Sequence, residues 1–308
     1  MVTPTSRRAF LMGRRTSATP FEQFCARLER TCLGSVRTAP SNAHSAQAPQ
    51  AWLKPVRLED IAHARALCQE YRVALMLEGG ALPAARTQAT LWVSPQPAGA
   101  TLSLVDSRTG VWRADAGCTV EQLKETGVFA GMDLPPELTV AQWFAWPETV
   151  SGGVLDSIRL VEQAEVLLAD GTVEVLGPFG ATAKAPLRSL TVQRLVPKLF
   201  ELAGSEAALR CTQLVPWPAC YRLDALIATA AHEPNLAQLL FGHQGRLGWV
   251  QALWLKRADA QSQVAREAPA SEYDKELASH LDQELKHILD PLGVFGSNSK
   301  LKGLESAS

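Results

Sequence analysis

The sequence lacks the features that mark several common classes of protein. No run of about 18 apolar residues occurs, so no transmembrane helix is predicted. The 30 basic and 31 acidic residues leave a net charge of −1, which excludes a nucleic-acid binder that depends on bulk positive charge. Hydrophobic residues make up 46% of the chain, whereas disordered chains combine low hydrophobicity with high net charge. The 308 residues are therefore expected to fold into about two domains.

Several common binding motifs are also absent from the sequence. The six cysteines are scattered and form no C-x-x-C pair, and no zinc or iron–sulfur spacing occurs. Scattered cysteines in a long chain fit a reducing compartment better than a disulfide framework. Neither a G-x-G-x-x-G fingerprint after a strand nor a P-loop is present. These absences exclude a dinucleotide-binding Rossmann fold and a P-loop NTPase.

The N-terminal region is basic. Residues 1–40 contain seven arginines and two glutamates, and residues 6–11 (Ser-Arg-Arg-Ala-Phe-Leu) look like a twin-arginine export motif. The apolar stretch that an export signal needs does not follow it, so we expect a non-cleaved basic arm. A short amphipathic helix is expected over residues 20–32, followed by a linker rich in Ala, Ser, Pro and Gln over residues 39–51. We expect the protein to be cytoplasmic or peripheral at the inner membrane.

The first folded region combines apolar strands with helices. Apolar residues recur at helical spacing from Leu58 to Tyr71, and the continuously apolar residues 73–77 predict a strand that is buried on both faces. Further strands are expected near residues 91–93, 101–105 and 111–116. The last of these strands leads into a helix that Thr119 caps. Residues 164–175 predict a β-hairpin, because Asp-Gly lies between two apolar runs.

A glycine pair follows the buried strand at Gly79 and Gly80. Glycine allows backbone conformations that other residues rarely adopt, so this pair is consistent with an ordinary tight turn. A run of free backbone N–H groups at such a turn can also cradle a phosphate. The glycines alone do not decide between a structural turn and a phosphate-binding loop.

The order of these segments resembles the FAD-binding domain of the vanillyl-alcohol-oxidase type, known as the PCMH-type domain. The branch that it resembles most contains the FAD subunits of bacterial glycolate oxidase and D-lactate dehydrogenase. Four segments match family elements in the family's order: residues 78–82 (Glu-Gly-Gly-Ala-Leu), residues 116–119 (Ala-Gly-Cys-Thr) with Leu123, residues 149–153 (Thr-Val-Ser-Gly-Gly) and residues 166–171 (Val-Leu-Leu-Ala-Asp-Gly). Residues 198–212 resemble the family's K-L-F element and the strand that follows it. Residues 289–295 resemble the family's closing L-D-P-x-G element.

This resemblance covers residues 52–296 and implies an α+β fold. It implies a PCMH-type FAD-binding domain of two α/β subdomains over residues 52–215, after a basic arm and linker over residues 1–51. Residues 216–308 are expected to form an abbreviated α+β cap and a C-terminal helix that returns to the FAD domain.

The resemblance also implies a cofactor and its site. The residues expected to hold FAD are Glu78, Gly79, Gly80, Ala81, Leu82, Gly117, Ser151, Gly152, Gly153 and Cys211. No histidine follows Gly80 at the position where some relatives attach FAD, so we expect noncovalent binding. The implied function is an FAD-dependent oxidoreductase subunit that oxidises a 2-hydroxy acid such as glycolate or D-lactate. A second flavin subunit and an iron–sulfur subunit are possible partners.

The sequence departs from the family pattern in two places. Only residues 154–165 separate the third and fourth matching segments, where the family carries a longer flavin-facing segment, and the inner glycines near Cys211 are missing. An alternative function is therefore a non-catalytic relative that has lost FAD and acts as an assembly subunit.

The C-terminal region offers no defined catalytic group. We expect a helix over residues 221–231, a strand over residues 248–255 and an amphipathic helix over residues 271–290. His232, His243, His280 and His287 are candidates for a base or a carboxylate ligand, but no pairing partner lies at a fixed spacing. Tryptophans are expected in the core rather than on a base-stacking surface.

Overall fold

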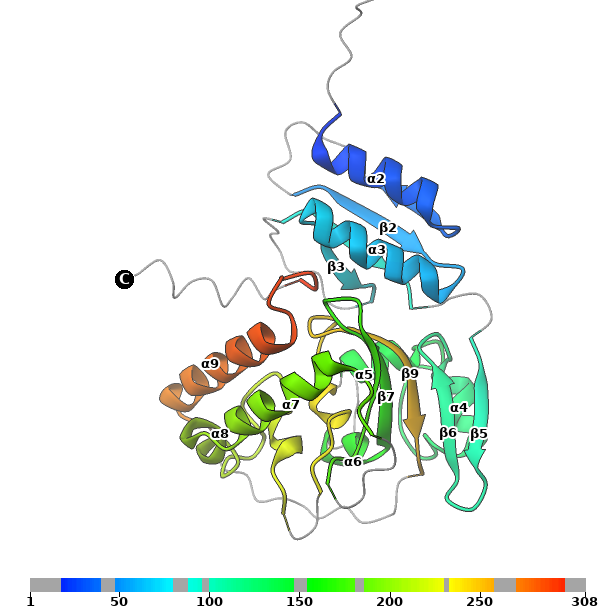
Figure 1. Ribbon diagram of the computed structural model, residues 1–308. Coiled ribbons are helices and arrows are strands. Elements are labelled where there is room, and N and C mark those ends of the chain that lie inside the picture. The colour runs from blue at the N-terminus through cyan, green and yellow to red at the C-terminus, as the bar shows by residue number, and fades with distance from the viewer. Residues whose placement is uncertain are drawn as a thin grey trace, which may run out of the picture.

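The computed structural model describes residues 18–39, 48–79, 88–95, 100–146, 154–180, 186–229, 233–257 and 270–296. Two β-sheets organise these residues, and each sheet has its own helices (Figure 1). The predicted α+β class is therefore confirmed. No helix in the described ranges has the length and hydropathy needed to cross a membrane.

The first sheet is built mainly from parallel strands. Its strand order is β1-β2-β4-β3, in which β2, β4 and β3 run parallel and β1 is antiparallel to β2. The strands are β1 (Ser35–Thr38), β2 (Gln50–Lys54), β3 (Ala74–Leu77) and β4 (Thr90–Val93). All four residues of β3 are buried, as its continuous apolar run predicts.

Two helices pack with this sheet. The predicted N-terminal helix is present as α2 (Pro20–Thr31), which begins with a capping box between Thr19 and Glu22. It lies against α3 (Leu58–Tyr71). Although we expected residues 1–51 to be an arm and linker, α2, β1 and the first residues of β2 form part of this subdomain, because the apolar face of α2 is buried in its core.

A single buried carboxylate connects the parts of the first subdomain. Asp60 is fully buried and accepts hydrogen bonds from the backbone N–H groups of Leu33 (2.9 Å), Gly34 (3.0 Å) and Val56 (3.0 Å). Burial alone would raise the pKa of Asp60, but the hydrogen bonds from Val56, Leu33 and Arg57 lower it below its ordinary value. The carboxylate thus fixes the loops that precede β1 and follow β2.

The second sheet is antiparallel, with the order β5-β6-β9-β7-β8. Its strands are β5 (Leu102–Asp106), β6 (Val111–Asp115), β7 (Val161–Leu167), β8 (Val173–Leu176) and β9 (Trp249–Leu255). The predicted hairpin is present as β7 and β8, and Asp170 at its turn accepts hydrogen bonds from Thr172 and Thr191. Thr119 caps the helix that follows β6, as predicted.

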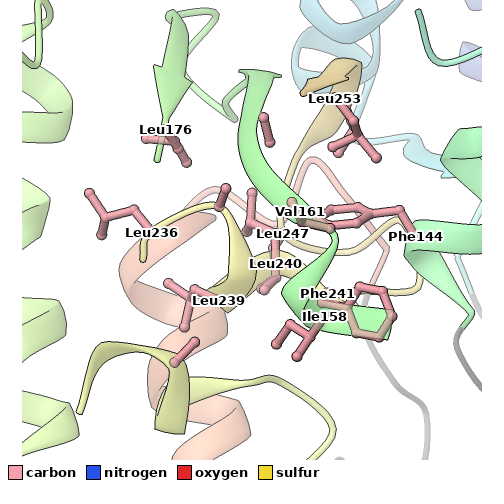
Figure 2. Packing of buried hydrophobic residues seen from close by; sticks show 14 of the residues in the cluster. Phe144, Ile158, Val161, Leu176, Leu236, Leu239, Leu240, Phe241, Leu247 and Leu253 are labelled. Carbon is pink, nitrogen blue, oxygen red and sulfur yellow. The ribbon is translucent and has the colours of Figure 1, made fainter. Parts of the chain in front are cut away.

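Helices pack with the second sheet and fill its core. They are α4 (Val120–Thr126), α5 (Val140–Ala145), α6 (Val154–Arg159), α7 (Leu190–Ala203), α8 (Glu206–Cys211) and α9 (Glu272–Leu289), with short 3-10 turns η2 (Leu223–Leu226) and η3 (Gln238–Leu240). Figure 2 shows part of this core, where Phe144, Phe241 and Leu240 meet strand residues such as Val161 and Leu253.

The C-terminal region completes the second sheet. We predicted a domain boundary between residues 215 and 216, but one hydrophobic core contains residues from both sides of it. The reason is that β9 lies at the centre of the sheet, between β6 and β7, with both of its edges paired. The predicted helix over residues 221–231 is wrong: η2 ends at Leu226, and the carbonyl of Ala225 accepts a hydrogen bond from Asn235 instead of continuing a helix.

The chain then returns to the first sheet. Helix α9 ends beside Asp290, and the backbone of Val294 and Gly296 pairs with Leu75 of β3. The partly buried ammonium of Lys286 donates to the carboxylate of Asp290 (2.5 Å) and to the carbonyls of Arg246 (2.6 Å) and Phe295 (2.5 Å). All three donors of this ammonium are thereby used to join α9, the loop before β9 and the C-terminal segment.

Replacing Asp60 by alanine is expected to lower the free energy of unfolding by at least about 3 kcal/mol, because three backbone N–H groups lose their acceptor. Urea denaturation measures this change. The exposed neighbour Glu59 provides the control, and Glu59→Ala is expected to change stability by less than about 0.5 kcal/mol. Equal effects of the two substitutions would contradict the role assigned to Asp60.

A second carboxylate makes stability depend on pH. Burial raises the pKa of Asp282 to about 6, although the backbone N–H groups of Cys220 and Tyr221 donate to it and oppose the rise. The folded state therefore binds a proton more tightly than the unfolded state, so this contribution to stability is present at low pH and is lost as the pH rises through about 6. Relative to Asp282→Asn, the wild-type protein should gain about 1 kcal/mol between pH 7 and pH 5. Thermal or urea unfolding at both pH values tests this, with Glu276→Gln on the exposed face of α9 as the control.

Candidate functional site

The first part of the candidate site lies where β3 ends. The backbone N–H of Glu78 still donates to Val93 of the neighbouring strand (2.9 Å), and Gly79 then turns away with φ +121°. A Cβ atom at Gly79 would lie 2.1 Å from Nε2 of Gln142, which donates to the carbonyl of Glu78 (3.0 Å). Both the backbone angle and the close side chain require glycine here.

The second part is the turn between β6 and α4. The N–H of Cys118 donates to the carbonyl of Asp115 (2.9 Å), which closes a tight turn around Gly117. The carbonyl of Ala116 accepts from the N–H of Ala141 (3.1 Å), and that of Cys118 accepts from Val140 (2.8 Å). The turn is therefore attached to the first turn of α5.

Helix α5 brings these two parts together. Ala141 bonds to the turn that contains Gly117, and the next residue, Gln142, bonds to the loop that contains Gly79. Neither Gly79 nor Gly117 donates its backbone N–H to another described residue. Two loops from different sheets are thus attached to one helical turn, and each has an N–H group without a partner among the described residues. Free backbone N–H groups in a loop can bind an anionic group such as a phosphate.

A third loop, residues 242–248, reaches the same place. Gly242 donates to the carbonyl of Phe144 (2.9 Å), and Gln244 donates to the carbonyl of Ala145 (3.0 Å), so this loop covers the C-terminal end of α5. A Cβ atom at Gly245 would lie 3.0 Å from Cβ of Leu77, at the end of β3. Our sequence predictions missed this loop. Its signal is a glycine at every third position, Gly242, Gly245 and Gly248, directly before a strand.

The structure brings some of the predicted site residues together. Glu78, Gly79 and Gly117 lie around the first turn of α5. Gly80, Ala81 and Leu82, together with Ser151, Gly152 and Gly153, lie outside the described residues. Their chain leaves the described part beside the same helix, at Gly79 and at Trp146, whose N–H donates to the carbonyl of Gln142 (2.9 Å).

Cys211 does not lie with them. It is the last residue of α8 and is buried beside α9, where its neighbour Arg210 pairs with Asp274 (2.7 Å). Burial and the nearby Asp274 raise the pKa of its thiol, so it is held as a neutral group. The expected strand at this position is wrong, because Ser205 caps a run of strong helix formers, Glu-Ala-Ala-Leu-Arg.

The candidate bases are dispersed. His280 and His287 lie on α9 with exposed side chains, and His280 is 3.6 Å from Glu284 on the same helix. His243 is buried in the loop that covers α5, and His232 lies outside the described residues. The tryptophans Trp143 and Trp249 are buried in the two cores, as expected. Among the described residues, no group of three His, Cys, Asp or Glu side chains could hold a metal ion.

Comparison with known proteins gives structural likeness only. No family model and no curated protein match the sequence. Alkyldihydroxyacetonephosphate synthase is similar in two crystal forms, with 16% and 14% identity and TM-scores of 0.39 and 0.41. Each match covers 70% of this chain and 34% or 33% of the other.

An isoeugenol complex of 4-ethylphenol oxidase from Gulosibacter chungangensis is also similar, with 15% identity and a TM-score of 0.45. That match covers 79% of this chain and 43% of the oxidase. The chain thus spans less than half the length of each of these structures. Since all three TM-scores are below 0.5, the likeness establishes no family.

The glycine at position 79 can be tested against another glycine of positive φ. Gly110 has φ +67° and open space at its Cβ position, whereas a Cβ at Gly79 meets Gln142. We expect Gly79→Ala to lower the free energy of unfolding by at least about 1 kcal/mol more than Gly110→Ala, since it also displaces the Gln142 hydrogen bond. Paired urea titrations measure the difference. If the two variants lose equal stability, Gln142 does not hold this loop.

Proposed function

We propose that this chain binds FAD noncovalently beside the first turn of α5 and acts as an FAD-dependent oxidoreductase subunit. The observation that carries the proposal is that neighbouring residues of α5, Ala141 and Gln142, hold the two loops of Gly79 and Gly117, whose backbone N–H groups have no partner among the described residues. Each belongs to a segment that resembles a family element.

The residues present are compatible with a pyrophosphate. Backbone N–H groups bind phosphate oxygens without adding charge of their own, and glycine lets the backbone approach closely. We propose that Gly79 and Gly117 donate to the pyrophosphate and that Glu78, with Gly80, Ala81 and Leu82, forms the loop around it. Ser151, Gly152 and Gly153, which follow α5, would complete the site. When bound, FAD supplies hydride chemistry, and the protein positions the flavin and adjusts its electrostatic surroundings.

The substrate proposed is a 2-hydroxy acid such as glycolate or D-lactate. Its only support is the resemblance of the sequence to FAD subunits that oxidise such acids. A second flavin subunit and an iron–sulfur subunit are proposed as partners on the same basis. No base is assigned.

A second candidate function is a non-catalytic relative that keeps the fold and assists assembly. Two observations favour it. Helix α6 is followed after one residue by β7 at Val161, so residues 154–165 form no additional loop. Helix α8 also replaces the glycine-containing strand that the family has near Cys211. Both changes remove backbone that would otherwise contact a flavin.

The flavin content of the purified protein separates the two functions. Under the first proposal, the protein carries about one FAD per chain, releases it on denaturation and loses its visible flavin absorbance when glycolate or D-lactate is added without oxygen. Protein that is colourless and takes up no added FAD would instead support the assembly function.

The paired glycine variants sharpen this experiment. Gly79→Ala should lose most of its bound FAD, whereas Gly110→Ala, which is far less constrained, should retain it. Retention of full flavin by Gly79→Ala would contradict the proposed binding site while leaving flavin binding itself intact. Protein that holds FAD but is not bleached by either acid would contradict only the proposed substrate.

A further inference from the structure

Residues 243–246 form a tight turn with a strained backbone. The N–H of Arg246 donates to the carbonyl of His243 (2.9 Å), and the two central residues have positive φ angles, +53° at Gln244 and +71° at Gly245. These values describe a type I′ turn, which favours glycine or asparagine at both central positions. Gln244 is neither, and its N–H is held by the carbonyl of Ala145. Strain of this kind clusters at ligand-binding and catalytic sites.

The side chain at the start of this turn is buried and has a free donor. His243 is 2% exposed, and its Nδ1 accepts a hydrogen bond from the N–H of Gly245 (3.2 Å). A neutral imidazole whose Nδ1 accepts must carry its proton on Nε2. Among the residues that the structure describes, none is a hydrogen-bond partner of that Nε2. Burial and the nearby Arg246 lower the pKa of His243 to about 3, so the ring remains neutral at physiological pH.

The turn that carries His243 lies beside the proposed site. The ring centre of His243 lies 5.6 Å from that of Phe144 in α5, and the next glycine, Gly245, lies against Leu77 of β3. The turn is therefore held between the ends of β3 and α5. The segments that continue from Gly79 and from Trp146 leave the described chain at these same two ends.

We infer that His243 is a ligand-contact residue, whose Nε2–H donates a hydrogen bond to an acceptor atom of the bound flavin dinucleotide. This inference rests on the proposed function. The acceptor is an oxygen or nitrogen of either the flavin ring or the pyrophosphate, since both present acceptors to an N–H donor. A base role for His243 is excluded in this arrangement, because Nε2 already carries a proton and Nδ1 is occupied by Gly245.

Two amide substitutions distinguish the roles of the two ring nitrogens of His243. The amide of glutamine can place an N–H near the position of Nε2, whereas asparagine can place its oxygen near Nδ1 and keep the bond from Gly245. If Nε2 contacts the ligand, His243→Gln should bind FAD within about threefold of wild type, and His243→Asn should bind about tenfold more weakly. A purely structural role predicts the reverse order, with His243→Asn unaffected.

The measurement is FAD binding to the flavin-free full chain, monitored through flavin fluorescence. Thermal unfolding is recorded for each variant. Riboflavin and FAD are compared as ligands. A loss shared by both ligands assigns the acceptor to the flavin ring, and a loss limited to FAD assigns it to the pyrophosphate. His287→Asn, at an exposed position on α9, is the control and should bind both like wild type.

Two other outcomes would overturn the inference in different ways. Wild-type protein that takes up neither ligand removes the proposed function and this contact with it. Wild-type protein that binds FAD while His243→Asn binds it equally well removes only the contact.

Discussion

Adjacent hydrogen bonds from α5 hold the two halves of this molecule in register. Ala141 bonds to the turn after β6 in the second sheet, and Gln142 bonds to the loop after β3 in the first. Because these residues are consecutive in one helix, the two loops cannot shift relative to each other without breaking a backbone or side-chain hydrogen bond. The phosphate binding that we propose for the N–H groups of Gly79 and Gly117 depends on this register.

The rest of the junction reinforces the same arrangement. The apolar core of the first subdomain continues into the second through Ala141, Leu167 and Trp249, so the two sheets share buried surface. Arg65 on α3 donates to the carbonyl of Ala169 in the β7–β8 hairpin (2.6 Å). At the other edge of β3, Lys286 and Asp290 hold the C-terminal segment against the strand. The end of β3 is thus supported by chain segments that are distant from it in sequence.

The chain departs in two segments from the family pattern that its sequence resembles. Residues 154–165 contain the short helix α6 and the first residues of β7, and residues 206–211 form helix α8, where the pattern has an additional loop and a strand. Under the proposed function, fewer backbone groups would then be available to surround a flavin ring. The contact proposed for His243 would offset part of that loss, because it adds a donor from a loop that lies outside the matching segments.

Local signals in the sequence determined most of the elements. The apolar run before Glu78, the Asp-Gly turn, the cap at Thr119 and the helical spacing in residues 271–290 predict their structures, because each depends on neighbours within a few residues. Tertiary structure alone decided how they combine. The central position of β9, the bonds from Leu33 and Gly34 to Asp60 and the strained turn at Gln244 all depend on partners far away in the chain. Cys211 is different, because the local helix signal after Ser205 places it in α8, away from the candidate site. Pairing between distant strands and loops leaves no periodicity in the sequence, so the register of this junction became visible only in the folded protein.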